Sequence, residues 1–290
     1  MPAVIVRSAV PEDYPRIKTL WQLAFGDSEA LIDRFFTLCS TARACVLEDG
    51  VVWAVLFLLP VTLALPGGRV ARGEYLYALC THPAARGKGY AGRLIADTHR
   101  TMQAAGTEFI ATVPARPALH PFFAQNGFSE YFSTREGSLT RQMLPATVPE
   151  DTAAVLSPDA YQAVRAAHLA ERRDGGYVLF HREAAAFQQT LSQLQGGSLF
   201  GLSIAGQTGC AAVEMRKGGR LLCKELLLPD ALAPRGAALL AERLRAAACT
   251  VRTPAWCTWP GDAQVRPFGM IKWYLPPPNG AAAYLGLALD

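Results

Sequence analysis

The most constraining feature of this 290-residue sequence is that one order of patterns occurs twice. In each half, two segments with apolar residues at helical spacing precede three apolar, β-rich runs, and a further helical segment and a β-rich run follow. A repeat of this kind predicts two tandem α+β units. Two unrelated units with a similar rhythm are the alternative interpretation.

The first half is bounded by clear turn and capping signals. Gly50 and the Gly67–Gly68 pair are expected in turns between strands, and Ser28 at a helix start. We expect strands at 4–9, 44–48, 51–65, 72–81, 109–113, 128–132 and 137–143, and helices at 11–25, 28–39, 90–105 and 121–125.

The second half follows a proline-rich stretch. Residues 145–158 contain three prolines and little apolar pattern, which predicts a linker at 146–158 between domains at 1–145 and 159–290. We expect helices at 160–171, 182–194 and 234–248, and strands at 199–204, 209–215, 221–228, 250–256, 270–275 and 283–289.

Composition excludes several classes of protein. Hydrophobic residues make up 51% and charged residues 18%, and the net charge of +4 lacks the dense basic face of a nucleic-acid binder. The apolar run Val51–Leu65 is shorter than the roughly 20 residues that span a bilayer, and the N-terminus has no secretory pattern. Seven cysteines without a CxxC pair predict reduced core thiols. We therefore expect a cytoplasmic protein without a metal, membrane or nucleic-acid partner, and leave a homo-oligomer open.

The segment Leu79–Gly92 carries the chemistry. A strand ends near Thr81, and a helix begins within a glycine-rich turn. Gly87 and Gly89 leave the main chain accessible, and the unpaired amides of a helix start attract a diphosphate. Basic side chains at positions 86 and 88 add charge. The alternative is an ordinary turn with solvated basic residues.

Two other nucleotide-binding patterns do not fit this segment. Gly87, Gly89 and Gly92 satisfy GxGxxG, but this turn follows several strands joined by hairpins, and no acidic residue ends the next strand. The P-loop pattern GxxxxGK[ST] is absent.

The run Arg86-x-x-Gly89-x-Ala91, preceded by Thr81-His-Pro83, resembles the acyl-CoA loop of the GNAT acetyltransferases. Phe122–Phe128 is similar to the aromatic short helix and Gly-Phe of that family, and the resemblance covers about residues 3 to 143. Pro234–Ala237 lacks the second glycine, so the second half looks like a degenerate copy. The tandem arrangement resembles the enhanced-intracellular-survival type, without the further C-terminal domain for which this chain is too short.

The resemblance implies a mixed-sheet α/β GNAT fold in two tandem domains and acetyl-CoA as co-substrate. It implies direct attack by a primary amine of a small molecule or peptide on the thioester, in a ternary complex. The alternatives are a non-catalytic acyl-CoA sensor and an interaction scaffold. The residues expected to hold the cofactor are Leu79, Cys80, Thr81, Arg86, Gly87, Lys88, Gly89, Tyr90, Ala91 and Gly92.

The groups that move protons are less clearly marked. Many family members carry a tyrosine where this chain has Phe123, and His120, about one helical turn earlier, is a candidate replacement. Glu74 is a candidate general base, and Cys80 a candidate through its backbone N–H or as a nucleophile. By resemblance, the C-terminal Asp290 is a further candidate. The acceptor pocket is expected to include Trp21, Phe25 and Phe123.

Overall fold

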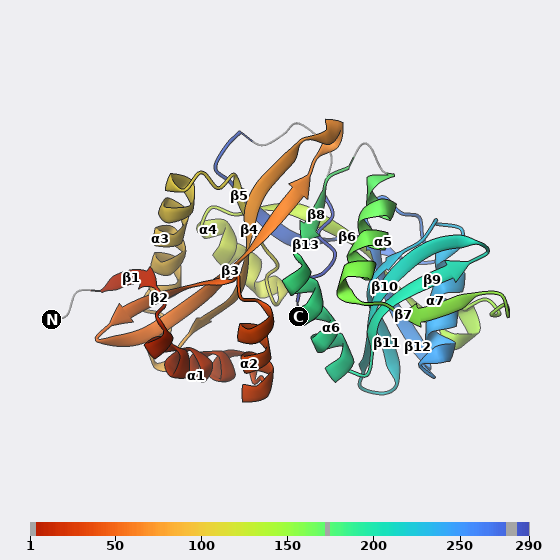
Figure 1. Ribbon diagram of the computed structural model, residues 1–290, viewed down its shortest axis with the longest axis horizontal. Coiled ribbons are helices and arrows are strands. Elements are labelled where there is room, and N and C mark those ends of the chain that lie inside the picture. The colour runs from red at the N-terminus through yellow and green to blue at the C-terminus, as the bar shows by residue number, and fades with distance from the viewer. Residues whose placement is uncertain (1–3, 172–174, 277–282, 290) are drawn as a thin grey trace. The chain divides into compact units, whose positions relative to one another are not determined.

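The computed structural model describes residues 4–171, 175–276 and 283–289, and these residues divide into two compact units (Figure 1). The first unit comprises residues 4–63, 70–130 and 269–276. The second comprises residues 64–69, 131–171, 175–268 and 283–289. The division therefore differs from the contiguous one that the sequence suggests, because each half of the chain contributes a strand segment to the other unit.

The first unit is built on a mixed sheet. Its strands are β1 (Ile5–Ser8), β2 (Arg43–Asp49), β3 (Val51–Ala64), β4 (Val70–Thr81), β5 (Phe109–Thr112) and the last part of β13 (Gln264–Trp273), in that spatial order. β1 and β3 each pair antiparallel with β2, β13 pairs antiparallel with β5, and β4 and β5 run parallel.

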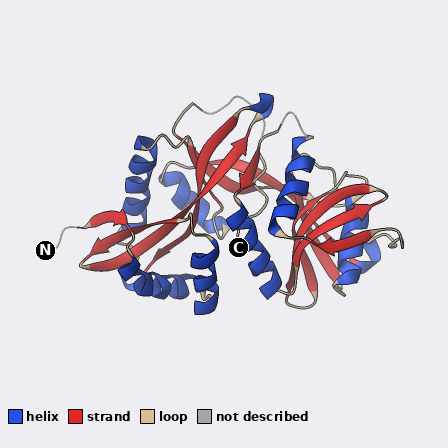
Figure 2. Ribbon diagram, in the orientation of Figure 1, coloured by secondary structure: helices blue, strands red, loops and turns tan. Residues whose placement is uncertain are grey.

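Helices cover both faces of this sheet (Figure 2). They are α1 (Tyr14–Phe25), α2 (Glu29–Leu38), α3 (Tyr90–Ala104) and α4 (His120–Gln125). The Ser28 hydroxyl caps α2 by accepting from the Leu31 N–H, as predicted. Leu94 and Ile95 of α3 pack on one face of the sheet, and Trp21 and Phe35 of α1 and α2 pack on the other. Burial from both sides explains why β3 is apolar almost throughout.

The second unit repeats this plan. Its strands are β6 (Ser129–Thr140), β7 (Thr152–Val155), β8 (Tyr177–Phe180), β9 (Ser198–Ile204), β10 (Gln207–Arg216), β11 (Arg220–Leu227) and β12 (Ala248–Pro254). Its helices are α5 (Pro158–Ala170), α6 (Arg182–Leu194) and α7 (Ala233–Arg243). The spatial order is β6-β12-β11-β10-β9-β7, with β11 and β12 parallel and the remaining neighbours in this order antiparallel.

Several predicted boundaries were wrong. The two strands expected at 128–132 and 137–143 are one strand, β6, in which Gly137 lies beneath the Trp259 ring rather than in a turn. The expected linker contains β7, an edge strand that pairs with β9 and buries only Ala153, so it has no apolar alternation to detect. Residues 283–289 are buried but form only isolated bridges rather than a strand.

Candidate functional site

The turn between β4 and α3 is shaped by two glycines. Gly87 and Gly89 have φ of +78° and +77°, in the left-handed region, and Gly89 is the N-cap residue of α3. A Cβ atom on either would meet nothing within 4 Å. These glycines are therefore required by backbone conformation, and the space beside them is open.

The start of α3 offers unpaired amides beside this space. The Arg93 N–H donates to the Gly89 carbonyl (3.0 Å) as the first bond of the helix, and helix geometry leaves the amides of Tyr90, Ala91 and Gly92 without a partner in the turn before them. The helix dipole adds partial positive charge, and the side chains of Arg86 and Lys88 are exposed here. The turn is therefore a site suited to a phosphate group.

The sheet opens just before this turn. β4 and β5 pair in parallel only from Gly73 opposite Phe109 to Tyr75 opposite Ala111. Beyond this point the Thr112 hydroxyl donates to the Leu76 carbonyl (3.1 Å), and Ala78 has φ +47°, a left-handed conformation that departs from regular strand geometry. The last residues of β4 therefore present main-chain groups that an extended ligand can pair with.

The end of β4 has an unused polar atom. The Thr81 hydroxyl oxygen is buried and has no hydrogen-bond partner in the described residues. Leu79 packs against the core beneath α3. A chain that lies along β4 and ends in a diphosphate at the turn would supply the missing partner, so the residues present fit coenzyme A.

The predicted nucleophile is not supported. Cys80 is 1% exposed, its thiol donates to the Ala78 carbonyl (3.2 Å), and burial raises the pKa of that thiol well above its usual value. A buried, protonated thiol does not attack a thioester, so Cys80 contributes packing and main-chain groups.

Glu74 lies on the face of the sheet that α3 covers, near Met102. Tyr75 and Tyr77 lie on the other face. Its Oε1 accepts from the Arg43 guanidinium (2.5 Å), which also contacts the Met102 sulfur. Burial raises the pKa of Glu74, and Arg43 opposes that rise. This arrangement holds the carboxyl group in an ion pair away from the aromatic face, and it does not support Glu74 as the base.

The candidates on α4 have separate environments. His120 Nδ1 contacts the Glu130 carboxylate, which leaves Nε2 as the ring nitrogen directed away from Glu130. Phe123 is 5% exposed and packs against Phe128 in the core, with ring centroids 5.5 Å apart, so it is not a pocket residue. Asp290 lies outside the described residues.

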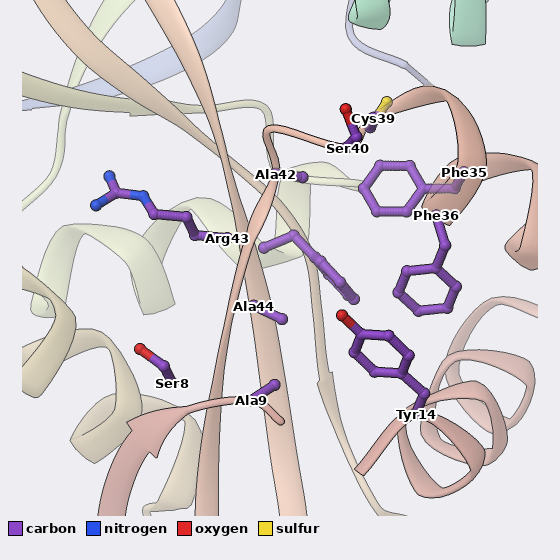
Figure 3. Close-up of a pocket in the computed structure, with 11 residues that line it drawn as sticks. Ser8, Ala9, Tyr14, Phe35, Phe36, Cys39, Ser40, Ala42, Arg43 and Ala44 are labelled. Carbon is purple, nitrogen blue, oxygen red and sulfur yellow. The ribbon is translucent and has the colours of Figure 1, made fainter. Parts of the chain in front are cut away.

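A cavity of about 250 Å³ lies against the aromatic face of the first unit (Figure 3). Figure 3 shows Ala42, which precedes β2, and Ala44 of β2 directed toward the aromatic rings, and Arg43 directed to the other side of the strand. Trp21, predicted to line the acceptor pocket, is buried in the adjacent cluster, and Phe25 is 44% exposed outside the lining. The lining residues are Ser8, Ala9, Tyr14, Phe35, Phe36, Cys39, Ser40, Ala42, Arg43, Ala44 and Phe57.

Sequence reasoning did not predict that Tyr14 lines the cavity. Its ring stacks on that of Phe36 in the cavity wall, with centroids 5.0 Å apart, and the apolar spacing of α1 does not distinguish core residues from lining residues. Glu130 was missed because its partner His120 is ten positions away across the end of α4. No local pattern signals such a pair.

No three His, Cys, Asp or Glu side chains in the described residues are grouped so as to hold a metal ion. None of the helices in those residues has the length and apolarity needed to cross a membrane.

Comparisons with known proteins address the fold directly. A family model for the acetyltransferase (GNAT) domain matches residues 5–130. No curated protein matches the sequence.

Solved structures match nearly the whole chain. A probable N-acyltransferase from Enterococcus faecalis V583 has a TM-score of 0.76 at 13% identity, covering 94% of this chain and 73% of that one. Eis1 from Mycobacterium abscessus has a TM-score of 0.66 at 12% identity, covering 94% and 74%. A tandem GNAT protein from the clavulanic acid biosynthesis pathway has a TM-score of 0.53 at 15% identity, covering 95% and 100%.

At these identities the solved structures establish the fold, and the family model places residues 5–130 within it. The mixed α/β architecture and its tandem arrangement are those that the sequence predicted. Residues 5–130 therefore match the GNAT acetyltransferase domain, and the chain has the fold of the tandem GNAT proteins.

Proposed function

We propose that the first unit transfers an acetyl group from acetyl-CoA to a primary amine of a small molecule or peptide, by direct attack in a ternary complex. The observation that carries the proposal is the opening between β4 and β5 beyond Tyr75 and Ala111, which leads directly to the glycine turn at Gly87 and Gly89. An extended ligand with a diphosphate at one end matches both features.

Each part of the site has a separate task in this proposal. The amides of residues 89–92 hold the diphosphate, and main-chain groups of residues 79–81 pair with the pantetheine arm. When bound, acetyl-CoA supplies an activated thioester carbonyl. The backbone N–H near Cys80 polarises that carbonyl, and the protein chiefly holds the amine in line for attack.

The pair of His120 and Glu130 is the best-supported proton carrier. A carboxylate at Nδ1 orients the imidazole, which leaves Nε2 to exchange a proton with a reacting group. We propose the pair in place of the absent tyrosine, since Phe123 has no proton to give and is buried in the core.

The cavity lined by Tyr14, Phe36 and Ala44 is the candidate acceptor site. Phe35 and Phe57 line the cavity and contact Trp21 on its far side, and Phe35 also contacts Tyr77, which directly precedes the left-handed residue Ala78. We propose that an apolar part of the acceptor occupies this cavity while its amine reaches toward β4.

One observation favours a second candidate, an acyl-CoA sensor without turnover. The family's usual proton donor is replaced by Phe123, and neither Cys80 nor Glu74 is placed to substitute for it. The two candidates share the cofactor site and differ in whether a thiol is released.

The test measures thiol release from acetyl-CoA with a panel of primary amines, together with binding of coenzyme A by calorimetry. Gly89→Val should lower the affinity for coenzyme A by at least 100-fold, because a branched side chain opposes the left-handed conformation and projects into the open space. Gly106→Val is the matched control, since Gly106 has φ +76° and equal free space but closes the far end of α3.

Tight binding without thiol release on any amine would favour the sensor. Equal loss of binding in the Gly89 and Gly106 variants would mean that folding, rather than the turn, was affected. No binding of coenzyme A to the wild-type protein would reject both candidates.

A further inference from the structure

Trp53, the third residue of β3, forms a fixed platform beside the cofactor turn. Its indole N–H donates to the Asp49 carbonyl (3.1 Å), and its own carbonyl accepts from the His82 N–H (2.9 Å). The His82 ring meets the indole edge to face, with centroids 5.4 Å apart. The ring is therefore held by both neighbouring strands at the point where β4 ends.

Two cations converge on this platform. The Arg16 guanidinium carbon and the Lys88 ammonium nitrogen each lie 5.6 Å from the centroid of the Trp53 ring. Arg16 comes from α1 and Lys88 from the turn, so elements far apart in the sequence bring them together. Attraction to the face of an indole ring orients both groups.

Neither cation is neutralised. Across residues 4–171, 175–276 and 283–289, neither Arg16 nor Lys88 forms an ion pair, and Arg16 donates only its Nε, to the Val52 carbonyl (2.9 Å). The nearby carboxylate of Asp49 instead accepts from the Tyr90 hydroxyl (2.5 Å). Both Nη groups of Arg16 and the ammonium of Lys88 therefore remain available to an anion.

We infer that Arg16 and Lys88, oriented by Trp53, bind the phosphate monoester on the ribose of coenzyme A. This inference rests on the proposed function. The diphosphate is matched by main-chain amides of the turn, whereas Arg16 and Trp53 belong to α1 and β3 and form a second centre of positive charge. A dianionic monoester matches two cations, and a guanidinium with two free Nη groups can hold it through paired hydrogen bonds. Trp53 acts as a positioning residue.

The test compares coenzyme A with 3′-dephospho-coenzyme A, which keeps the diphosphate and lacks the monoester. By calorimetry, the wild-type protein should bind coenzyme A about tenfold more tightly. Arg16→Gln, Lys88→Met and Trp53→Leu should each reduce that preference to about threefold or less. Trp53→Phe should restore most of it, because an aromatic face is kept.

Lys18→Met is the matched control. Lys18 lies on the same helix as Arg16, but its charge is already paired with Asp33 and Glu29, so the preference should stay at the wild-type value. Equal wild-type affinity for the two ligands would overturn the inference and leave the proposed function standing. An equal loss of both affinities in the variants would also overturn it. Binding of neither ligand would reject the proposed function, and the inference with it.

Discussion

The turn that follows β4 in the first unit and the turn that follows β11 in the second occupy the same place in two similar sequences of elements. In the first, Gly89 adopts a left-handed conformation with open space beside it. In the second, Gly236 lies inside α7, and a Cβ atom there would stand 2.4 Å from a methyl group of Leu228. The same residue type thus has open space beside it in one unit and permits close packing in the other.

The basic residues of the two turns differ in the same way. Arg86 and Lys88 of the first turn are exposed. Arg235, at the start of α7 in the second unit, donates to Asp151 from Nη2 (2.8 and 2.7 Å) and from Nε (3.1 Å), and Asp151 also accepts from the Ala205 N–H. A turn whose arginine is already satisfied by a carboxylate does not attract a phosphate. The basic side chain at the second position is therefore engaged within the protein, whereas those of the first turn are exposed.

The faces beneath the paired helices differ as well. In the first unit this face is aromatic and adjoins the cavity of Figure 3. In the second, Arg165 and Glu225 form a wholly buried ion pair (2.8 Å), and Arg165 also donates to the Val178 and Leu285 carbonyls. The Tyr161 hydroxyl donates to Glu225 as well (2.6 Å). One face leaves space for a ligand, and the other is closed by its own polar groups.

The largest predicted effect tests that closed face. Glu225→Gln keeps the shape of the side chain but leaves the Arg165 charge unpaired inside the protein, and it should lower the free energy of unfolding by about 3–5 kcal/mol. Urea denaturation measures the loss.

Glu136→Gln is the control, because Glu136 pairs with Arg252 in the same unit with each side chain 21% exposed, and its loss should cost about 1 kcal/mol or less. Coenzyme A affinity of the folded Glu225 variant should match the wild type. A fall in that affinity would mean that the second unit supports the cofactor site, against our comparison.

The next prediction compares α3 with α7. The residues that α7 buries are alanine, leucine and glycine, whereas α3 buries His99. The His99 ring contacts the Tyr274 hydroxyl (2.6 Å) and the Asn126 carbonyl (3.2 Å). Burial, with Lys272 nearby, lowers the pKa of His99 to about 4.

The unfolded chain binds a proton at His99 near pH 6.5, whereas the folded chain does so only near pH 4. The free energy of unfolding is therefore at its full value above pH 6.5 and decreases as the pH falls toward 4. At pH 5 the loss should be about 2 kcal/mol relative to neutral pH. His99→Gln should remove this part of the pH dependence in urea titrations, and the exposed His181→Gln should not. Identical slopes in the wild type and the His99 variant would contradict the assignment.

The sequence was sufficient to predict the structural features that depend only on residues close together in the chain. The glycine turn at Gly87 and Gly89, the cap at Ser28 and the order of strands and helices all follow from neighbouring residues. The exchange of β6 and β13 between the units could not be predicted, because it depends on pairings such as Val251 with Gly137 and Ile271 with Ala111, more than 100 positions apart.

The catalytic candidates show the same limit. Alternation along β4 placed Glu74 opposite Tyr75 and Tyr77, but it did not say which face the helices α1 and α2 would cover. The ion pair between Glu74 and Arg43 of β2 shows that Glu74 lies on the face away from α1 and α2, and it depends on a contact between two different strands. Where a residue's role depends on a partner in another element, sequence pattern supplies candidates and only packing selects among them.

The smallest predicted effect concerns the open face itself. Ala44→Leu adds three carbon atoms where Figure 3 shows the side chain directed toward Tyr14 and the aromatic rings. If the cavity holds part of the acceptor, KM for the best amine should rise about fivefold, equivalent to about 1 kcal/mol, with KM for acetyl-CoA unchanged. Ala104→Leu, exposed at the end of α3, is the matched control. An unchanged KM for the amine in a folded Ala44 variant would place the acceptor elsewhere, and the contrast between the open and closed faces would then concern packing alone.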